Sequence, residues 1–392
     1  MIPPSRSEAD GTPLPPVNRD GRGDDAVFGH DVVGDRPRRR RLSRGLRIGL
    51  WIVVPLALLS SLVVASALVK VPYWSFSPGA IRDTAGVVRV GGAETYPVEG
   101  SISFTTVSIR GRLSVAELAI GWIDPDTTIV HESEFLVDRD ADQNRQINMQ
   151  LMDSSTQTAS YVALDRLGYE VTIRGTGAIV VNVVEGAPAE GIIEPGDTIV
   201  SVDGMAVSLA NDLVETISER PPGTQVVLGV VPLGTDEVDE REVTLAARDD
   251  DPTKAFLGVS PVTRNESFEF PSAISIDFAT GGVGGPSAGL AFTLTLLDQL
   301  SPGDLTGGLD IAATGTIDRA GNVGPIGGLE QKAIAVRRQG VPIFLVPART
   351  PEDELREVYR LAGDSVQIVP VETLSDALEA LVSAGGDPLP TG

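Results

Sequence analysis

One uninterrupted apolar segment constrains this chain more than any other feature. Residues Ile48–Val69 hold 22 positions without a single charged side chain. An α-helix of about 20 apolar residues is long enough to cross the hydrocarbon core of a bilayer. The sequence therefore predicts one transmembrane helix over residues 48–69, with the rest of the chain divided between the two sides of a membrane.

The residues before this segment indicate its orientation. Arginines crowd there, namely Arg36, Arg38, Arg39, Arg40, Arg41, Arg44 and Arg47. Positive charge beside a span stays in the cytoplasm, so we expect a cytoplasmic N-terminus and residues 71–392 outside, on a single-pass cell-membrane protein. Residues 1–47 are rich in Pro, Gly, Asp and Arg, which predicts a disordered cytoplasmic tail. A cleaved signal peptide is the alternative, because Ala65-Ser66-Ala67 resembles a cleavage site; the length of the apolar run favours an uncleaved anchor.

Composition excludes several classes of function. The net charge is −23, and residues 71–392 alone hold 20 basic and 47 acidic residues, so nucleic-acid binding is not expected. Cysteine is absent, which excludes disulfides and a Cys nucleophile. Histidine occurs only at His30 and His131, and lysine only at Lys70, Lys254 and Lys332. Because lysine can lose its proton near neutral pH and arginine cannot, each lysine is a candidate for acid–base chemistry.

Three segments follow the apolar run. Residues 71–168 show strand patterns near Gly86–Val90 and Ser101–Ile109 and a helical pattern near Gln146–Leu167. Residues 170–248 form a compact β-rich unit, and residues 386–392 are a tail. Residues 250–385 alternate strands and helices, which predicts an α/β domain. The expected elements are Ala273–Phe278, Ser287–Leu300, Ile311–Gly315, Leu329–Gln339, Ile343–Val346 and Leu374–Ser383.

A glycine-rich segment, Gly281–Gly289, connects a predicted strand to an apolar helix and allows three interpretations. A phosphate-binding loop needs Gly-Lys-Ser/Thr at its end, and no lysine is present. The nucleophile elbow G-x-S-x-G fits Gly285-Pro286-Ser287-Ala288-Gly289, but that fold requires a downstream histidine and none follows His131. The third interpretation keeps Ser287 as a nucleophile whose proton is taken by a different base.

Lys332 is a suitable base for Ser287. It follows Gly327-Gly328 in a predicted helix, and Leu329 and Val336 lie on its own helical face. Burial on such an apolar stripe would lower the pKa of the lysine and supply a neutral amine, as in known Ser–Lys pairs. A lysine that snorkels to the surface is the alternative.

Two motifs resemble the proteolytic domain of the Lon family. The first is Gly285-Pro286-Ser287-Ala288-Gly289, and the second runs through Thr314-Gly315-Thr316-Ile317 and Pro325–Lys332. The resemblance implies that Ser287 is the nucleophile, Lys332 the base, and the backbone around Gly285, Pro286 and Ala288 an oxyanion site. Thr314 is implied to orient Lys332, or else is an ordinary strand-end residue. ATP-dependent Lon usually has an acidic residue three positions before the serine, where this chain has Gly284.

A second resemblance, to PDZ domains, lies in Pro195–Gly204. The resemblance implies a peptide that adds as a strand beside Ile179–Val184, against a helix capped by Ser208 and reaching about Glu219. Another strand is expected at Gln225–Val231. The loop of Gly175, Thr176, Gly177 and Ala178 matches the carboxylate-binding loop in its glycines, while Thr176 and Ala178 replace the usual apolar residues. A purely structural insert is the alternative.

Together these features resemble bacterial membrane-anchored Lon-like peptidases with an inserted PDZ domain. The expected fold is an α/β (α+β) Lon-type proteolytic domain, with residues 71–168 as its first part, residues 170–248 as the PDZ domain and residues 250–385 as the part with the Ser–Lys dyad. No Walker A motif is present, so the resemblance implies an ATP-independent serine endopeptidase for protein or peptide substrates, with no cofactor and with a trimer or hexamer as subunit arrangement. An inactive membrane-tethered PDZ adaptor is the alternative function.

Metal binding is not expected. His131-Glu132 lacks the second histidine of H-E-x-x-H, because Phe135 stands at that position. Asp138, Asp140, Asp142 and Asn144 imitate a calcium loop, but Gln143 replaces its glycine and Met149 its final glutamate.

Overall fold

The computed structural model describes residues 44–137, 140–248 and 251–390. The chain divides into two units, Met1–Ser60 and Ser61–Gly392. Helix α1 (Arg44–Leu68) contains the predicted span of residues 48–69 except Val69, and its stretch Trp51–Leu68 is long and apolar enough to cross a membrane. Most of the predicted N-terminal tail, residues 1–43, lies outside the described residues.

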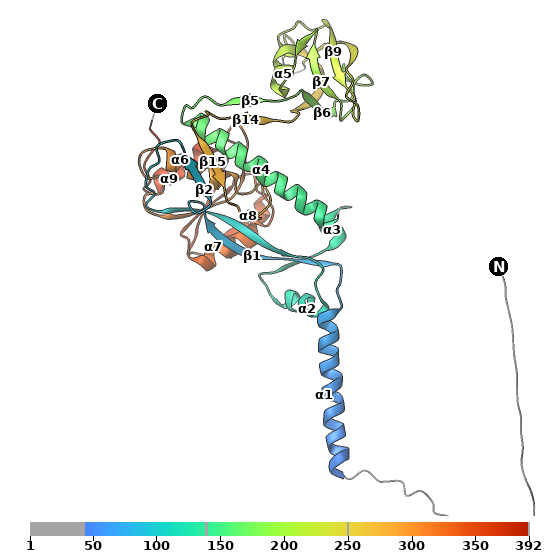
Figure 1. The fold of residues 1–392 in the computed structure, drawn as a ribbon, viewed down its shortest axis with the longest axis vertical. Coiled ribbons are helices and arrows are strands. Elements are labelled where there is room, and N and C mark those ends of the chain that lie inside the picture. The colour runs from blue at the N-terminus through green and yellow to red at the C-terminus, as the bar shows by residue number, and fades with distance from the viewer. Residues whose placement is uncertain (1–43, 138–139, 249–250, 391–392) are drawn as a thin grey trace, which may run out of the picture. The chain divides into compact units, whose positions relative to one another are not determined.

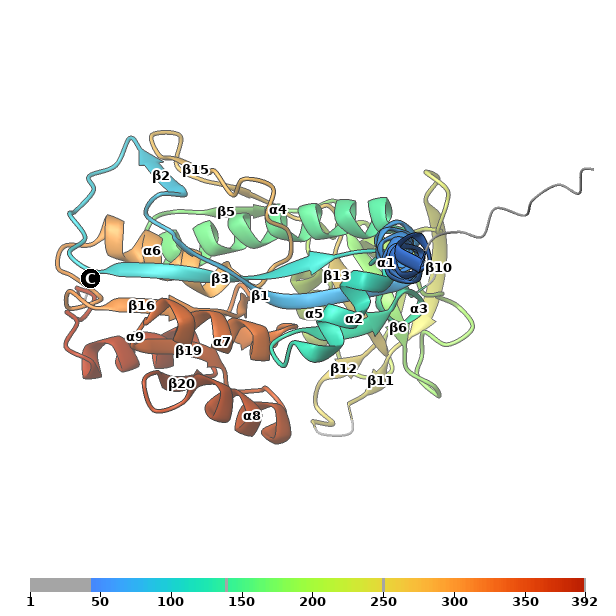
Figure 2. The same ribbon diagram turned by 90° about the horizontal axis from the view of Figure 1, so that it is seen from below.

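A six-stranded mixed sheet forms the centre of the second unit (Figures 1 and 2). Its strand order is β20-β19-β16-β3-β1-β4. The PDZ-like region is the segment of residues 175–263. Three strands of the central sheet precede it, namely β1 (Tyr73–Asp83), β3 (Ser101–Arg110) and β4 (Thr128–His131). The three that follow it are β16 (Asp310–Ala313), β19 (Ile343–Pro347) and β20 (Gln367–Val371). Because β3 pairs in parallel with β16, the two halves of the chain share one sheet, and the PDZ-like region interrupts a single domain.

Alternating side chains of the central strands build two cores. Ile311 and Ala313 of β16 join one core, whereas Ala312 between them joins the other, as the two-residue period of a strand requires. The first core also contains residues of α4 (Ala141–Arg166), α6 (Gly289–Leu300) and α9 (Leu374–Ser383). The second contains residues of α7 (Leu329–Gln339) and α8 (Glu352–Ala362). In Figure 2, α4 and α7 lie on opposite sides of β3.

The PDZ-like region has its own sheet and core. The sheet order is β10-β9-β7-β6-β13, and β8 pairs with β7. These strands are β6 (Ala178–Val183), β7 (Thr198–Val202), β8 (Met205–Ala206), β9 (Gln225–Val231), β10 (Asp239–Thr244) and β13 (Val259–Thr263). Helix α5 (Ala210–Ser218) covers this sheet with Leu213 and Ile217. Because β13 belongs to this sheet, the PDZ-like region extends beyond the predicted boundary at residue 248.

Short elements complete the described fold. A two-stranded ribbon of β5 and β14 connects the PDZ-like region to the rest of the second unit (Figure 1). The remaining strands are β2 (Val88–Gly91), β5 (Thr172–Arg174), β11 (Ala246–Ala247), β12 (Ala255–Phe256), β14 (Ser267–Glu269), β15 (Ser275–Phe278), β17 (Thr316–Ile317) and β18 (Val323–Gly324). The remaining helices are α2 (Val115–Ile123) and α3 (Glu132–Leu136).

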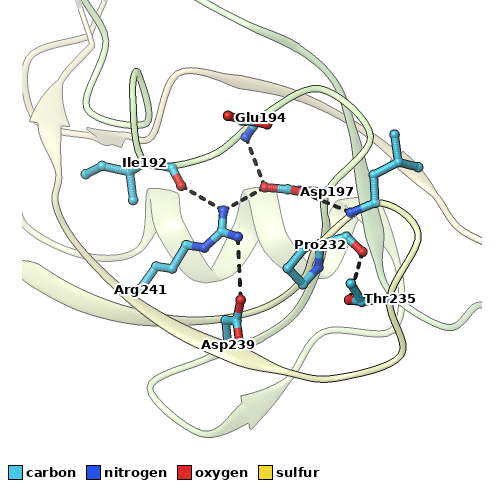
Figure 3. A network of polar contacts seen from close by, with 8 residues as sticks. Ile192, Glu194, Asp197, Pro232, Thr235, Asp239 and Arg241 are labelled. Carbon is cyan, nitrogen blue, oxygen red and sulfur yellow. Dashed lines mark hydrogen bonds and ion pairs between the residues drawn. The ribbon is translucent and has the colours of Figure 1, made fainter.

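A buried carboxylate holds the turns of the PDZ-like region together (Figure 3). Asp197 is only 4% exposed, and its Oδ2 lies 2.7 Å from Nη1 of Arg241 on β10. Asp197 also accepts hydrogen bonds from the amides of Glu194 and Leu233. Burying a carboxylate is unfavourable unless it is paired and hydrogen-bonded, and all three partners are present here. This explains Asp197 in the Pro-Gly-Asp turn as a structural residue.

Candidate active site

Ser287 lies in a tight turn directly before α6. The turn begins at Gly285, whose φ of +93° is strained for any residue with a side chain. The amide of Gly285 donates to the carbonyl of Asn148 at 2.7 Å, and Ser155 Oγ donates to the carbonyl of Pro286 at 3.0 Å. Both partners belong to α4, so this helix fixes the backbone of the turn. A helix was predicted over Ser287–Leu300, but α6 begins two residues later, at Gly289. Ser287 therefore lies in the turn, where it is partly exposed.

Lys332 lies in the first turns of α7, with its side chain in the protein interior. The helix begins after Gly328, which has a φ of +70°, and an added Cβ there would lie 2.8 Å from Val107. Only 2% of Lys332 is exposed. This burial disfavours the charged amine and lowers its pKa to about 7 from the ordinary value of 10.5. No salt bridge of Lys332 occurs among the described residues, so no carboxylate opposes the shift.

The structure brings Ser287, Lys332 and Thr314 into one hydrogen-bonded group. Nζ of Lys332 lies 2.7 Å from Oγ of Ser287 and 2.9 Å from Oγ1 of Thr314. Oγ1 of Thr314 donates to the carbonyl oxygen of Ser287 at 3.1 Å. A hydroxyl has one proton, so Thr314 must accept from Lys332. A neutral Lys332 then uses one N–H on Thr314 and can turn its lone pair toward the Ser287 hydroxyl.

A cleft opens at this group. Its volume is about 1060 Å³, and Ser287 and Lys332 are among its lining residues. Apolar side chains also line it, including Phe76, Met152 and Ile326. Within the described part of the chain, the backbone amides of Ser287 and Ala288 donate no hydrogen bond to protein, whereas the Gly285 amide is occupied and Pro286 has none. Two donors beside the Ser287 hydroxyl are therefore available to a ligand oxygen in the cleft.

The PDZ-like region differs from the sequence-based prediction. The position beside β6 that was expected to receive a peptide is filled by β13, which pairs with β6 along Val259–Thr263. The amide of Thr176 donates to the carbonyl of Arg264, and the amide of Gly177 donates to the carbonyl of Ser208. Two amides of the loop Gly175–Ala178 therefore already donate to acceptors inside the fold. The predicted Ser208 cap is also absent, because α5 begins after Leu209, and Asp212 accepts from the amides of both residues.

A cavity beside β13 marks a different groove. It has a volume of about 590 Å³ and lies between α5 and the segment from β12 to β13. Strand β13 is last in the order of its sheet, so one of its edges pairs with no strand of that sheet, and Val259 and Pro261 of β13 line the cavity. Gly258 has a φ of +87°, and the amides of Leu257 and Gly258 donate to no acceptor among the described residues. The sequence signal for this groove is a glycine between apolar residues, Phe256-Leu257-Gly258-Val259.

His131 and Asp140, whose sequence motifs do not fit a metal site, have structural roles. Nδ1 of His131 accepts from the Ser133 amide at the start of α3, and its ring packs edge-on against Tyr73. Asp140 caps α4 together with Gln143. Among the described residues, no group of three or more His, Cys, Asp or Glu side chains is arranged to hold a metal ion.

Comparison with known protein families decides what these two regions are. Residues 262–384 match the Lon protease (S16) C-terminal proteolytic domain, and residues 165–239 match the PDZ domain. This chain carries a Lon-type proteolytic domain and a PDZ domain. The resemblance to both families is thereby confirmed, as is the mixed α/β fold with a PDZ domain.

Curated relatives named Lon protease are similar to part of this chain. The protein from Campylobacter jejuni is 37% identical over 95 residues, which cover 24% of this chain and 12% of that protein. The one from Methylocella silvestris is 33% identical over 190 residues, covering 46% of this chain and 22% of that protein. This chain therefore spans less than a quarter of the length of these relatives.

A solved PDZ domain is also similar to part of this chain. It comes from an SdrC-like protein of Listeria monocytogenes, with 25% identity and a TM-score of 0.21. The similarity covers 22% of this chain and 88% of that one.

Proposed function

We propose that this chain is an ATP-independent serine endopeptidase with Ser287 as nucleophile and Lys332 as general base. The observation that carries the proposal is the 2.7 Å contact between a buried amine and a serine hydroxyl at the edge of a cleft. A serine hydroxyl needs a base within hydrogen-bond reach, and a base with a pKa near 7 is neutral often enough to act at physiological pH. The Lon-type proteolytic domain supports the same chemistry.

Acylation follows from the geometry of the dyad. The lone pair of Lys332 takes the proton of Ser287 while Oγ attacks the carbonyl carbon of the scissile peptide bond. The negative charge on the carbonyl oxygen is stabilised by the free amides of Ser287 and Ala288, beside the start of α6. The Lys332 ammonium then gives its proton to the leaving amine as the C–N bond breaks. An ester between Ser287 and the substrate remains.

Deacylation uses the same groups. With the amine product gone, neutral Lys332 takes a proton from a water molecule, whose oxygen attacks the ester carbon. The ammonium returns this proton to Oγ of Ser287 as the ester bond breaks. Thr314 positions Lys332 throughout, because its own proton is held by the Ser287 carbonyl and its oxygen accepts from Nζ. Gly284 stands where an acidic residue is usual, so the proposed mechanism uses no carboxylate.

The PDZ domain is proposed to bind substrate or regulatory peptides in the groove between α5 and β13. The supporting observations are the cavity, the edge of β13 and the free amides of Leu257 and Gly258, which suit a terminal carboxylate.

We further propose that Trp51–Leu68 anchors the enzyme in the cell membrane with residues 71–392 outside, from the length of the span and the arginines before it. Exposed segments of membrane or extracytoplasmic proteins are the proposed substrates. A trimer or hexamer stays a prediction from family resemblance.

Peptide cleavage by full-length variants tests the enzymatic proposal. Ser287→Ala and Lys332→Ala should each abolish cleavage of an unfolded protein without added ATP, while circular dichroism stays unchanged. Lys332→Arg is the matched control, since it keeps a positive charge but supplies no neutral amine, and it should be equally inactive. Undiminished cleavage by any of these variants would refute the dyad. If the wild type itself cleaves nothing but binds peptides, the inactive PDZ adaptor becomes the better description.

A further inference from the structure

Helix α2 turns an apolar face to the solvent. Its inward side is formed by Leu118 and Gly121, which are buried. On the outward side, Ile120 is 67%, Trp122 69% and Ile123 83% exposed. A surface helix normally presents polar residues to water and apolar residues to the core. In α2 both sides are apolar, so an apolar partner is missing from its outward face.

The one charge within α2 is compensated locally. Glu117 accepts from the amide of Ser114 in a capping box, and its Oε2 lies 3.2 Å from Nζ of Lys70. With the helix dipole and the amine both beside this carboxylate, no unpaired charge remains in α2 to oppose an approach to lipid.

The position of α2 along the fold identifies the partner. Val71 donates its amide proton to the carbonyl of Leu113, and Val115 donates to the carbonyl of Val69. These bonds attach the start of α2 to the residues that directly follow α1. A nine-residue helix is about 14 Å long, so α2 begins beside the end of the proposed span and extends only about this distance along its own axis. The polar region of one leaflet is itself about 5 to 8 Å thick.

We propose that the outward face of α2 is a second membrane contact, which places Ile120, Trp122 and Ile123 in the interfacial region of the outer leaflet. Tryptophan is enriched at this depth, and helices with one apolar face lie in the plane of the interface. The inference rests on the proposed membrane span. Its ligand is the lipid bilayer, not another protein chain.

The contact also fixes the catalytic domain relative to the lipid. In the segment after α2, Thr128 accepts a hydrogen bond of 2.8 Å from Gln331, and Asp126 forms an ion pair with Arg338. Both partners lie on α7, the helix that carries Lys332. The proposed lipid contact at α2 is therefore linked through these two contacts to the helix that carries Lys332.

Tryptophan fluorescence of the full-length chain in lipid nanodiscs tests this contact. The chain has three tryptophans, Trp51, Trp74 and Trp122, and pairwise Phe substitutions leave one at a time. Trp122 alone should lose most of its emission with lipids brominated near the headgroups, and little with aqueous iodide. Trp51 alone should be quenched by brominated lipid and reports the span. A Tyr359→Trp probe in a background without the other three reports a water-exposed site on α8 and should respond to iodide only.

Each outcome has one meaning. If Trp51 is quenched by brominated lipid but Trp122 only by iodide, the face is open to water and the inference is wrong. If Trp122 escapes both quenchers, a second copy of the chain covers the face, which also overturns the lipid contact. If Trp51 is not quenched by lipid, the span itself fails. Ile123→Asp offers a second test, because this side chain is too exposed to matter for folding, and it should reduce lipid quenching of Trp122.

Discussion

The pH dependence of acylation is the sharpest consequence of the buried lysine. An ordinary lysine with a pKa of 10.5 is neutral in about one molecule of every 3,000 at pH 7. With its pKa lowered to about 7, Lys332 is neutral in about half of the molecules at that pH, in about a tenth at pH 6 and in about a hundredth at pH 5. Burial alone thus raises the fraction of molecules with a neutral Lys332 at pH 7 by roughly three orders of magnitude.

The single-turnover rate at which an activated ester acylates the full-length enzyme reports the fraction of molecules with a neutral Lys332. The rate should rise about tenfold per pH unit below pH 7 and level off above it, because the neutral amine is the reactive form. Lys332→Arg should remove the whole profile. A rate that is flat between pH 5 and 8, or that keeps rising to pH 10, would refute the claim that a desolvated Lys332 is the base.

Three further predictions concern Thr314, Lys332 and the PDZ groove. Thr314→Val should lower the plateau rate about 10- to 100-fold, whereas Thr314→Ser should retain it, because only the hydroxyl positions the amine. The folded pKa of Lys332 lies below its unfolded value, so the wild type should gain stability relative to Lys332→Met by up to ~1.4 kcal/mol per pH unit from pH 7 to 10.5, and thermal unfolding should show this slope. Val214→Asp in the PDZ groove should weaken binding of an apolar C-terminal peptide about tenfold in fluorescence polarisation, and Glu215→Gln should not. Equal effects of both variants in the last pair would argue against the groove.

Local pattern was sufficient to predict many elements. Helix Leu329–Gln339 and strand Gln225–Val231 have the predicted bounds, because a glycine at each end of the helix and a run of β-branched residues in the strand are strong local signals. Helix α8 was missed although it has a clear signal, with Pro351 before three acidic residues in its first turn. The apolar helical stripe of Lys332 allowed either burial or snorkelling of its side chain, and the structure shows burial.

Long-range pairing could not be predicted in this way. The local sequence predicts that strand β13 belongs to the following α/β domain. Only its pairing with β6 shows that it belongs to the PDZ sheet. This single pairing moved the proposed peptide groove away from Gly175–Ala178. In the candidate active site, the resemblance to the Lon family already paired Ser287 with Lys332, but only the structure shows how Thr314 bonds to both the serine turn and Nζ of Lys332. The outward face of α2 gave no signal at all, since apolar periodicity does not reveal which side of a helix lacks a partner.

Covalent labelling of the full-length protein tests whether Lys332 activates Ser287. The protein is treated with a serine-reactive phosphonate at pH 8, and the modified residue is located by peptide mass spectrometry. We expect one adduct, on Ser287, which is lost when Lys332 is replaced by Met or Arg. An adduct on another serine, or labelling of Ser287 that persists without Lys332, would contradict it.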